Sequence, residues 1–275
     1  MNRVTPALGG TAQAPAPAAV PVRWSARYLM VWASLLALWE AAVRTGLYTG
    51  LFAPPPSRVL TTLGDMTVDG TLSAHLASTL LRIVLGLLIG GSIGLLLGLA
   101  MGTTPRVRRL IDPIVAALHP IPRLAFFPLL IVAFGIGEIS KMAAVSLGAF
   151  FPMLLNTVAG IRGLNPVHLE LASNYGASPW QRFTRVLLPG SLPLMLTGLR
   201  LSANVAFHAT IGIEMVGSRF GIGALLWQAW QTFRIDRLYA LMVIVAVIGI
   251  GLASLVRWIA GSAAPWSRDR GERLA

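Results

Sequence analysis

Arg123, Arg200, His208 and Glu214 are ionisable side chains that lie inside strongly apolar stretches of this sequence. If these stretches cross a membrane, each ionisable group costs roughly 3 kcal/mol or more unless it is paired or hydrated. Such groups either contact a polar solute or hold the protein together by pairing. All four are therefore candidates for a solute translocation pathway.

Residues suited to covalent chemistry are scarce. The chain has no cysteine, its four histidines are scattered, and its single lysine, Lys141, follows Ser140 rather than preceding a Ser or Thr. A Walker A site needs Gly-Lys-Ser/Thr, and a zinc site needs clustered His or Cys. We therefore expect no cofactor, no metal and no ATP hydrolysis by that route in this chain. An integral membrane enzyme would need a clustered acid, base or metal set, and the sequence contains none on one face.

The composition is that of a membrane protein. Of 275 residues, 55% are hydrophobic and 12% charged, with a mean hydropathy of +0.72. At about 20 residues per helical span, the chain has room for roughly five to seven spans and no large soluble domain. A net charge of +12 in a soluble protein would point to nucleic acid, but in a membrane protein it also reflects topology. We expect an all-α integral membrane protein with no nucleic-acid partner.

Six apolar segments are predicted to span the membrane, at residues 28–43, 80–101, 111–134, 142–159, 192–216 and 238–256. The third is interrupted by Pro113, Pro120, Pro122 and Pro128, and Pro removes backbone donors. Such a broken segment must be buried among other helices or line a wet cavity.

The second segment carries a glycine every four residues, at positions 86, 90, 94, 98 and 102. A step of four residues turns a helix about 400°, so these glycines form one slowly winding groove. We interpret the groove as a surface for a closely packed helix. The alternative is that glycine is simply commoner in membrane helices.

Basic residues set the orientation. With the N-terminus inside, roughly twice as many Arg and Lys fall in inner as in outer segments, as the positive-inside rule requires. Both termini are then cytoplasmic, which fits six spans. The predicted organisation is a disordered cytoplasmic tail at 1–27, a transmembrane domain at 28–260 and a cytoplasmic tail at 261–275.

A polar loop at about 161–191 joins the fourth and fifth segments on the predicted inner side. It contains Glu170-Leu171-Ala172, then Gly176 after three residues, then Val186-Leu187-Leu188-Pro189 after nine more. This spacing resembles the cytoplasmic signature of the permeases of binding-protein-dependent ABC importers: Glu-Ala-Ala, three residues, Gly, nine residues, Ile, one residue, Leu-Pro. Leu171 and Val186 depart from it but keep its polarity.

The same loop has local signals for two short helices. Asn165 can cap a helix that begins with Pro166, and Ser178 can cap one that begins with Pro179. Gly176 can adopt a positive φ and end the first helix. The expected structure is a compact knob outside the membrane. An ordinary amphipathic interface loop is the alternative.

The resemblance implies that this knob is a coupling helix that docks on a separate ATPase subunit. The residues that it assigns to ATPase coupling are Glu170, Leu171, Ala172, Gly176, Ala177, Val186, Leu188 and Pro189.

Further segments are similar to the nitrate, sulfonate and taurine branch of these permeases. They are His75–Arg82, Ile121-Pro122, Phe134–Lys141, Gly148–Pro152, Leu155–Gly160 and Gly198–Arg200. The branch implies a type I importer permease in a bacterial inner membrane that carries a small anionic solute of sulfonate, taurine or nitrate type. Implied partners are a second copy of the chain, two ATP-binding cassette subunits that hold ATP and magnesium, and a periplasmic or lipid-anchored solute-binding protein.

Within the branch, Arg123 is unusual, since Pro is common at this position. A cation here could meet an anionic solute, or its side chain could extend to the inner interface. Arg200 and Glu214 match residue types usual in the branch, so helix packing and solute contact stay open for both. For His208 the alternatives are a hydrogen-bonded packing role and a pathway role.

An ion-coupled secondary transporter is the alternative function, because it would also have several spans and buried charges. It predicts uptake that survives loss of the ATPase.

Overall fold

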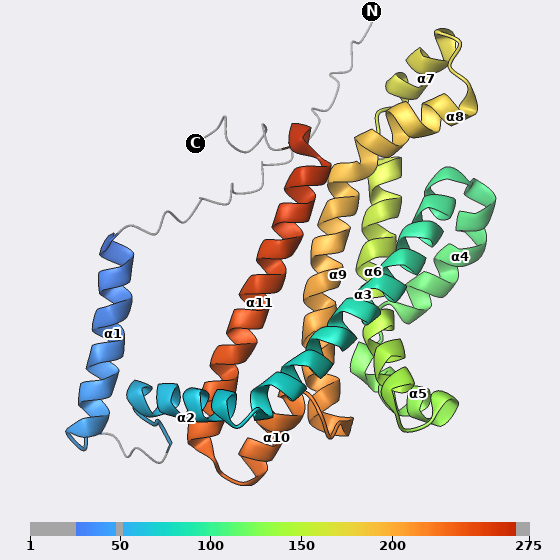
Figure 1. The fold of residues 1–275 in the computed structure, drawn as a ribbon. Helices are drawn as coiled ribbons and strands as arrows, with labels where there is room; N and C mark the ends of the chain where they lie inside the picture. The colour runs from blue at the N-terminus through green and yellow to red at the C-terminus, as the bar shows by residue number, and fades with distance from the viewer. Residues whose placement is uncertain (1–25, 48–51, 268–275) are drawn as a thin grey trace, which may run out of the picture.

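The computed structural model describes residues 26–47 and 52–267, and every regular element in these ranges is helical (Figure 1). The predicted tail at 1–27 lies almost wholly outside the described residues, as does most of the tail at 261–275.

The elements, in chain order, are α1 (Ala26–Arg44), α2 (Pro56–Val68), α3 (Thr71–Thr103), α4 (Pro105–Leu118), the 3-10 helix η1 (Arg123–Phe126), α5 (Phe127–Phe134), α6 (Glu138–Arg162), α7 (Pro166–Asn174), α8 (Pro179–Arg182), the π-helical turn η2 (Phe183–Leu187), α9 (Leu188–Gly217), α10 (Ile222–Gln231), α11 (Ile235–Ala263) and η3 (Pro265–Ser267).

Four helices of the described chain are long and apolar enough to cross a membrane: α3, α6, the continuous helix at 179–217, and α11. The helix pair α4 and η1–α5 makes a fifth span if it is counted as one, with a bend of 95°. This is the predicted proline-interrupted segment, and the bend lies at Pro120 and Pro122, between the two halves. The six predicted spans exceed these five by α1, a helix of 19 residues.

The glycine row of α3 packs against α6. A Cβ atom at Gly90 would overlap the carbonyl oxygen of Ser146, and one at Gly94 would overlap that of Phe150. Positions 86, 98 and 102 likewise face side chains of α6. The absence of side chains lets the two backbones approach closely, which is how small residues promote helix association in membranes. The predicted packing groove is confirmed, and its partner is α6.

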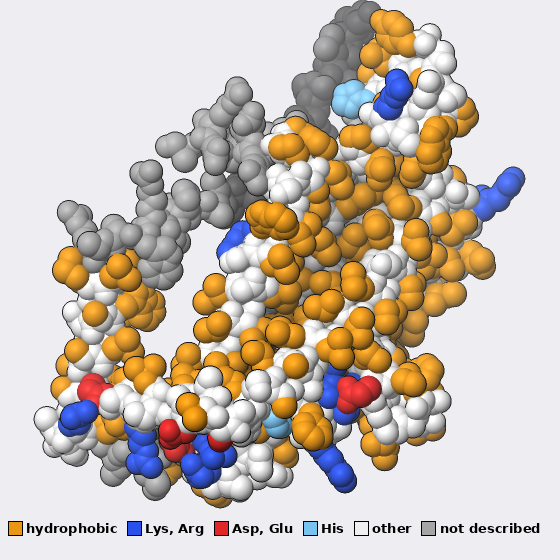
Figure 2. All heavy atoms as spheres, viewed as in Figure 1, with side chains coloured by type: hydrophobic (Ala, Val, Ile, Leu, Met, Phe, Trp, Pro, Cys, Tyr) orange, Lys and Arg blue, Asp and Glu red, His pale blue; other side chains and the backbone are white. Residues whose placement is uncertain are grey.

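The long helices form the body of the molecule, and shorter elements occupy its two ends (Figure 1). The helices α7 and α8 project at one end, whereas α2 and α10 lie across the other. Figure 2 shows hydrophobic side chains along the flanks of the long helices and charged side chains gathered near α2. An apolar flank with charged side chains gathered beyond its end is the surface expected of a membrane-spanning bundle.

The first helix stands largely apart from this body (Figure 1). It is held at one end, where the Trp39 ring contacts the Tyr239 ring in a tilted arrangement with 5.7 Å between centroids, and where Glu40 accepts hydrogen bonds from Ser57. Most of its apolar side chains are exposed, Leu38 to 68%. This apolar face is left for lipid or for another protein surface.

Candidate functional site

The loop between α6 and α9 folds as two short capped helices. The side chain of Asn165 accepts a hydrogen bond from the Val167 N–H at 3.0 Å, and Ser178 forms a reciprocal capping box with Gln181. Both predicted caps are confirmed. Each cap satisfies a backbone donor that the helix start leaves unpaired.

Gly176 makes the turn between these helices. Its φ of +77° lies in the left-handed region, which a side chain disfavours. The Ala177 N–H then donates to the Ala172 carbonyl at 3.0 Å, which closes the end of α7 in the manner of a Schellman motif. The predicted positive φ of Gly176 and its position at the end of the first helix are confirmed, and this turn sets the angle between α7 and α8.

The resulting knob, residues 165–182, is held together by Arg182, which donates to the Ser173 hydroxyl at 2.8 Å. It projects beyond the ends of the long helices (Figure 1). Glu170 is exposed, and so are large apolar side chains: Tyr175 to 86% and Trp180 to 71%. A projecting surface with exposed apolar groups is typical of a protein docking site.

The second half of the signature leads from the knob into the bundle. Val186 lies in η2, and Leu188 and Pro189 open α9. Leu188 packs, with Leu187, against a buried cluster of Met153, Ile161 and Met195. The knob is therefore attached to both α6 and α9, so a force on it would reach two spanning helices.

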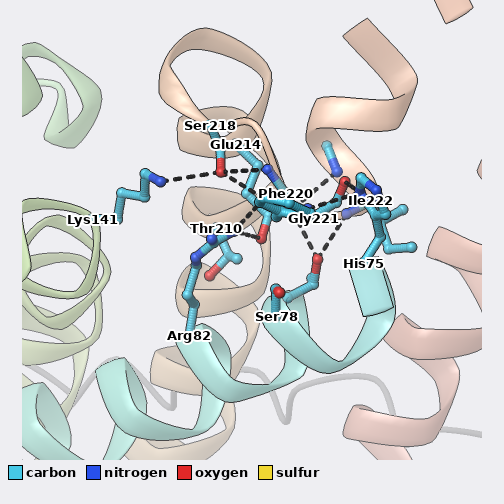
Figure 3. A network of polar contacts seen from close by, with 12 residues as sticks. His75, Ser78, Arg82, Lys141, Thr210, Glu214, Ser218, Phe220, Gly221 and Ile222 are labelled. Atoms are coloured by element: carbon cyan, nitrogen blue, oxygen red, sulfur yellow. Dashed lines mark hydrogen bonds and ion pairs between the residues drawn. The ribbon is translucent and has the colours of Figure 1, made fainter. Parts of the chain in front are cut away.

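A second constellation lies at the opposite end of the bundle, where α3, α6 and the turn after α9 meet (Figure 3). The buried guanidinium of Arg82 donates to Glu138 at 2.7 and 2.8 Å and to Glu214 at 2.7 Å. The Nη1 atom, which donates to Glu214, also donates to the Phe220 carbonyl oxygen at 2.7 Å. Lys141 adds contacts to Glu138 and Ser218 at 3.0 and 3.1 Å.

Glu214 is the most enclosed member of this polar network. Its side chain is fully buried, and it accepts hydrogen bonds from Thr79 and from the Gly223 N–H, both at 2.9 Å. The backbone at Gly221, with φ of +127°, lies directly against this carboxylate, where a Cβ atom would overlap it. Every carboxylate oxygen is thus paired, and the geometry favours the packing alternative for Glu214.

Arg123 and His208 share a cavity of about 300 Å³ between η1, α6 and α9. Asn204 is its third polar residue, and the rest of the lining is apolar. The Nε atom of Arg123 is buried without a hydrogen-bond partner among the described residues. The Nδ1 atom of His208 lies 2.8 Å from the Asn204 carbonyl, which can only accept, so Nδ1 donates.

Arg200 lines an adjoining cavity of about 610 Å³ between α9 and α11. This cavity also includes Asn204 and His208, so the two cavities meet along one face of α9. The structure therefore brings together three of the four intramembrane candidates and places Glu214 elsewhere.

Three members of the polar network, Arg82, Glu138 and Lys141, were not among the candidates selected from the sequence. The available signal was Arg82 itself, since a charge near the start of an otherwise uncharged span requires a partner. Its partners lie 56 and 132 residues away and could not be identified from local pattern.

Comparison with known proteins gives consistent matches. Residues 90–268 match the family described as binding-protein-dependent transport system inner membrane component. The Escherichia coli taurine transport system permease protein TauC is 35% identical over 239 residues, which cover 85% of this chain and 87% of that protein. The putative aliphatic sulfonates transport permease protein SsuC of Bacillus subtilis is 33% identical, with 86% of each chain covered.

The fold also matches a solved structure. A chain of the MetNI methionine ABC transporter, in an inward-facing conformation, superposes with a TM-score of 0.56 at 20% identity, covering 70% of this chain and 93% of that one. At this identity the likeness establishes the fold alone, which is that of a type I importer permease.

Proposed function

Since this chain belongs to the family of binding-protein-dependent transport system inner membrane components, we propose that it imports a small anionic solute and is driven through the knob at residues 165–182. The chain is a membrane-spanning permease subunit of an ABC importer, and the matches favour this function over an ion-coupled secondary transporter.

The observation that carries the coupling role is the geometry of the knob. It is rigidly capped, it exposes Glu170 beside large apolar groups, and it is anchored in the bundle through Leu188. We propose that Glu170, Leu171, Ala172, Gly176 and Ala177 form the surface for the ATPase. Val186, Leu188 and Pro189 would transmit its motion to α6 and α9.

The proposed assembly has two copies of this chain, two ATPase subunits and an external solute-binding protein. ATP and magnesium belong to the ATPase subunits. Closure of the ATPases would draw the two knobs together and open the pathway outward, and hydrolysis would then restore the inward-facing state.

The names of several relatives support the solute class. Taurine and aliphatic sulfonates each carry a sulfonate group, and a nitrate import permease protein from Leptolyngbya laminosa is 27% identical over 56% of this chain. Arg123, Arg200 and His208 are the proposed pathway residues. An anionic solute in an apolar bundle needs cationic partners, which the two guanidinium groups supply, and His208 lines both cavities.

We place the knob and both chain termini in the cytoplasm. In Figure 1 the first described residues of α1 and the end of α11 lie toward the end that carries α7 and α8, away from α2 and α10. This orientation puts the polar network at the outer end of the bundle.

Two substitutions in the knob test the coupling proposal. Glu170→Lys reverses the charge of an exposed carboxylate, and Gly176→Pro cannot adopt the φ of +77°. Both should reduce uptake and ATPase co-purification about tenfold or more, while the permease stays in the membrane. The measurements are labelled taurine, methanesulfonate and nitrate uptake by proteoliposomes, and the yield of ATPase bound to the permease.

Matched controls separate coupling from general damage. Asp65→Lys makes the same charge reversal on an exposed position of α2, and Gly176→Asn keeps a residue that tolerates positive φ. Both should retain uptake. Normal uptake in Glu170→Lys and Gly176→Pro would refute the coupling role of the knob, and uptake without the ATPase would restore the secondary transporter.

A further inference from the structure

Charged groups within the helical bundle are neutralised at one place and not at another. At the polar network, Arg82 and Lys141 meet two carboxylates, Glu138 and Glu214. Arg123, by contrast, has no ion-pair partner among the described residues, and its Nε atom is buried without a hydrogen bond. A buried donor without a partner is costly, so a site that keeps one is expected to receive an acceptor from elsewhere.

The surroundings of Arg123 match the needs of a small oxyanion. The cavity combines this cation with the side-chain amide of Asn204, which can donate to an anion, and apolar residues line most of the remainder. His208 borders the cavity with its Nδ1 hydrogen already donated to the Asn204 backbone carbonyl. Few polar groups in an apolar cavity are typical of small-ligand sites. A guanidinium pairs well with planar or tetrahedral oxyanions because its N–H groups form a fork.

The polar face continues along α9. Arg200, Asn204 and His208 are spaced by four residues, so they lie on one side of the helix over about 12 Å. All three are exposed in the single chain, and together they line the second cavity. Charged groups on such a face are not tolerated against lipid, so we expect the face to border water or protein.

We propose that Arg123, Asn204 and His208 form a binding site for a small oxyanion of sulfonate or nitrate type, continued toward Arg200 along α9. The inference rests on the proposed import function and names the residues that would select the charge of the solute. Arg123 is the anchor, because its side chain lies against α6 near Gly148 and borders the cavity rather than extending past the end of the bundle.

The cysteine-free sequence permits a direct chemical test. Gly212 lines the same cavity, and a Cβ atom there would meet nothing within 4 Å, so Gly212→Cys introduces a thiol without displacing a neighbour. The reaction rate of this thiol would be compared for anionic sulfonatoethyl methanethiosulfonate and cationic trimethylammonioethyl methanethiosulfonate. The full-length chain would be used in nanodiscs, alone and assembled with the ATPase, with and without ATP.

We expect the anionic reagent to be favoured and Arg123→Gln to lower that preference about fivefold or more, because one nearby charge is removed. Arg123→Lys should keep most of the preference. Millimolar methanesulfonate should slow the labelling, whereas neutral dimethyl sulfone should not. A cysteine at Val68, which is 90% exposed at the end of α2, should show no response to Arg123→Gln.

Three results would overturn the proposal: a thiol that reacts with neither reagent in any state, a preference unchanged by Arg123→Gln, or no protection by methanesulfonate. If methanesulfonate gives no protection although the thiol still prefers the anionic reagent, Arg123 would instead be assigned to the phosphate of a lipid headgroup. Stimulation of ATP hydrolysis by the binding protein, measured on the same preparations, tests the import function separately. The labelling result therefore stands even if that stimulation is absent.

Discussion

Arg82 and Arg123 both lie within the bundle, but among the residues that the structure describes only Arg82 has carboxylate partners. Arg82 is almost wholly buried and uses three nitrogens on two glutamates, whereas Arg123 borders a cavity with neutral and imidazole groups. Since a buried charge must be compensated, the first arrangement serves stability and the second leaves the charge available to a ligand.

Replacement of Arg82 by leucine should destabilise the protein strongly. Arg82→Leu leaves the fully buried carboxylate of Glu214 without its cation, and loss of one partner from a buried pair costs about 3–5 kcal/mol. Thermal unfolding in detergent should show the loss. Arg44→Leu removes the exposed pair with Glu40 and should cost at most about 1 kcal/mol.

The double variant Arg82→Leu, Glu214→Leu separates the pair from its surroundings. It should recover part of the lost stability, because no buried charge is left unpaired at Glu214. An Arg82→Leu protein as stable as the Arg44→Leu control would refute a structural role for the polar network.

At the scale of elements, the contact between α3 and α6 depends on which residues lack a side chain. Gly90 meets the backbone of Ser146, whereas a Cβ atom at the neighbouring Gly91 would contact, among the described residues, only the end of the Leu87 side chain, at 3.9 Å. The absence of a side chain is therefore required for the contact with α6 at Gly90 but not at Gly91.

These adjacent glycines make a matched pair of substitutions. Gly90→Ala would force the two helix backbones apart and should cost about 1–3 kcal/mol, as overpacking typically does. Gly91→Ala should be neutral or stabilising by up to about 1 kcal/mol, since alanine favours helix. The unfolding midpoints in detergent report both effects, and equal midpoints would contradict the close approach of α3 to α6.

At the scale of the whole molecule, the bundle has two chemically different ends. The knob projects at one, and the polar network with α2 and α10 occupies the other (Figures 1 and 3). The described chain has four helices long and apolar enough to cross between these ends, or five if the bent pair is counted as one span, and α1 would be a sixth pass. Six passes, as the proposed orientation requires, would place the start of α1 and the end of α11 on the same side as the knob, toward which both lie in Figure 1.

Labelling of single cysteines can determine this orientation. Tyr175→Cys on the knob should react with a membrane-impermeant maleimide in inverted vesicles but not in intact cells, and Val68→Cys on α2 should show the opposite pattern. Both positions are at least 86% exposed, so access is limited by the membrane and not by the fold. The permease would be produced without the ATPase, which would otherwise cover Tyr175, and both should react after permeabilisation. The reverse pattern would place the knob outside and exclude ATPase coupling through it.

The sequence by itself determined the features that depend on neighbours along the chain. The caps at Asn165 and Ser178, the turn at Gly176 and the groove of α3 follow from local conformational preferences and helical periodicity, and the structure confirms them. The spans followed from runs of apolar residues, although α1 is not among the helices that are long and apolar enough to cross.

Only the tertiary structure decided which charges are paired. Arg82 and Glu214 are 132 residues apart, and Arg123 and His208 come from different elements that meet at one cavity. Such contacts depend on which helices become neighbours, and a local pattern carries no information about that choice. For this reason the sequence could group Glu214 with Arg123 as intramembrane charges. The packing of α3, α6 and α9 separates them into a neutralised network and a cation with no ion-pair partner in the described part of the chain.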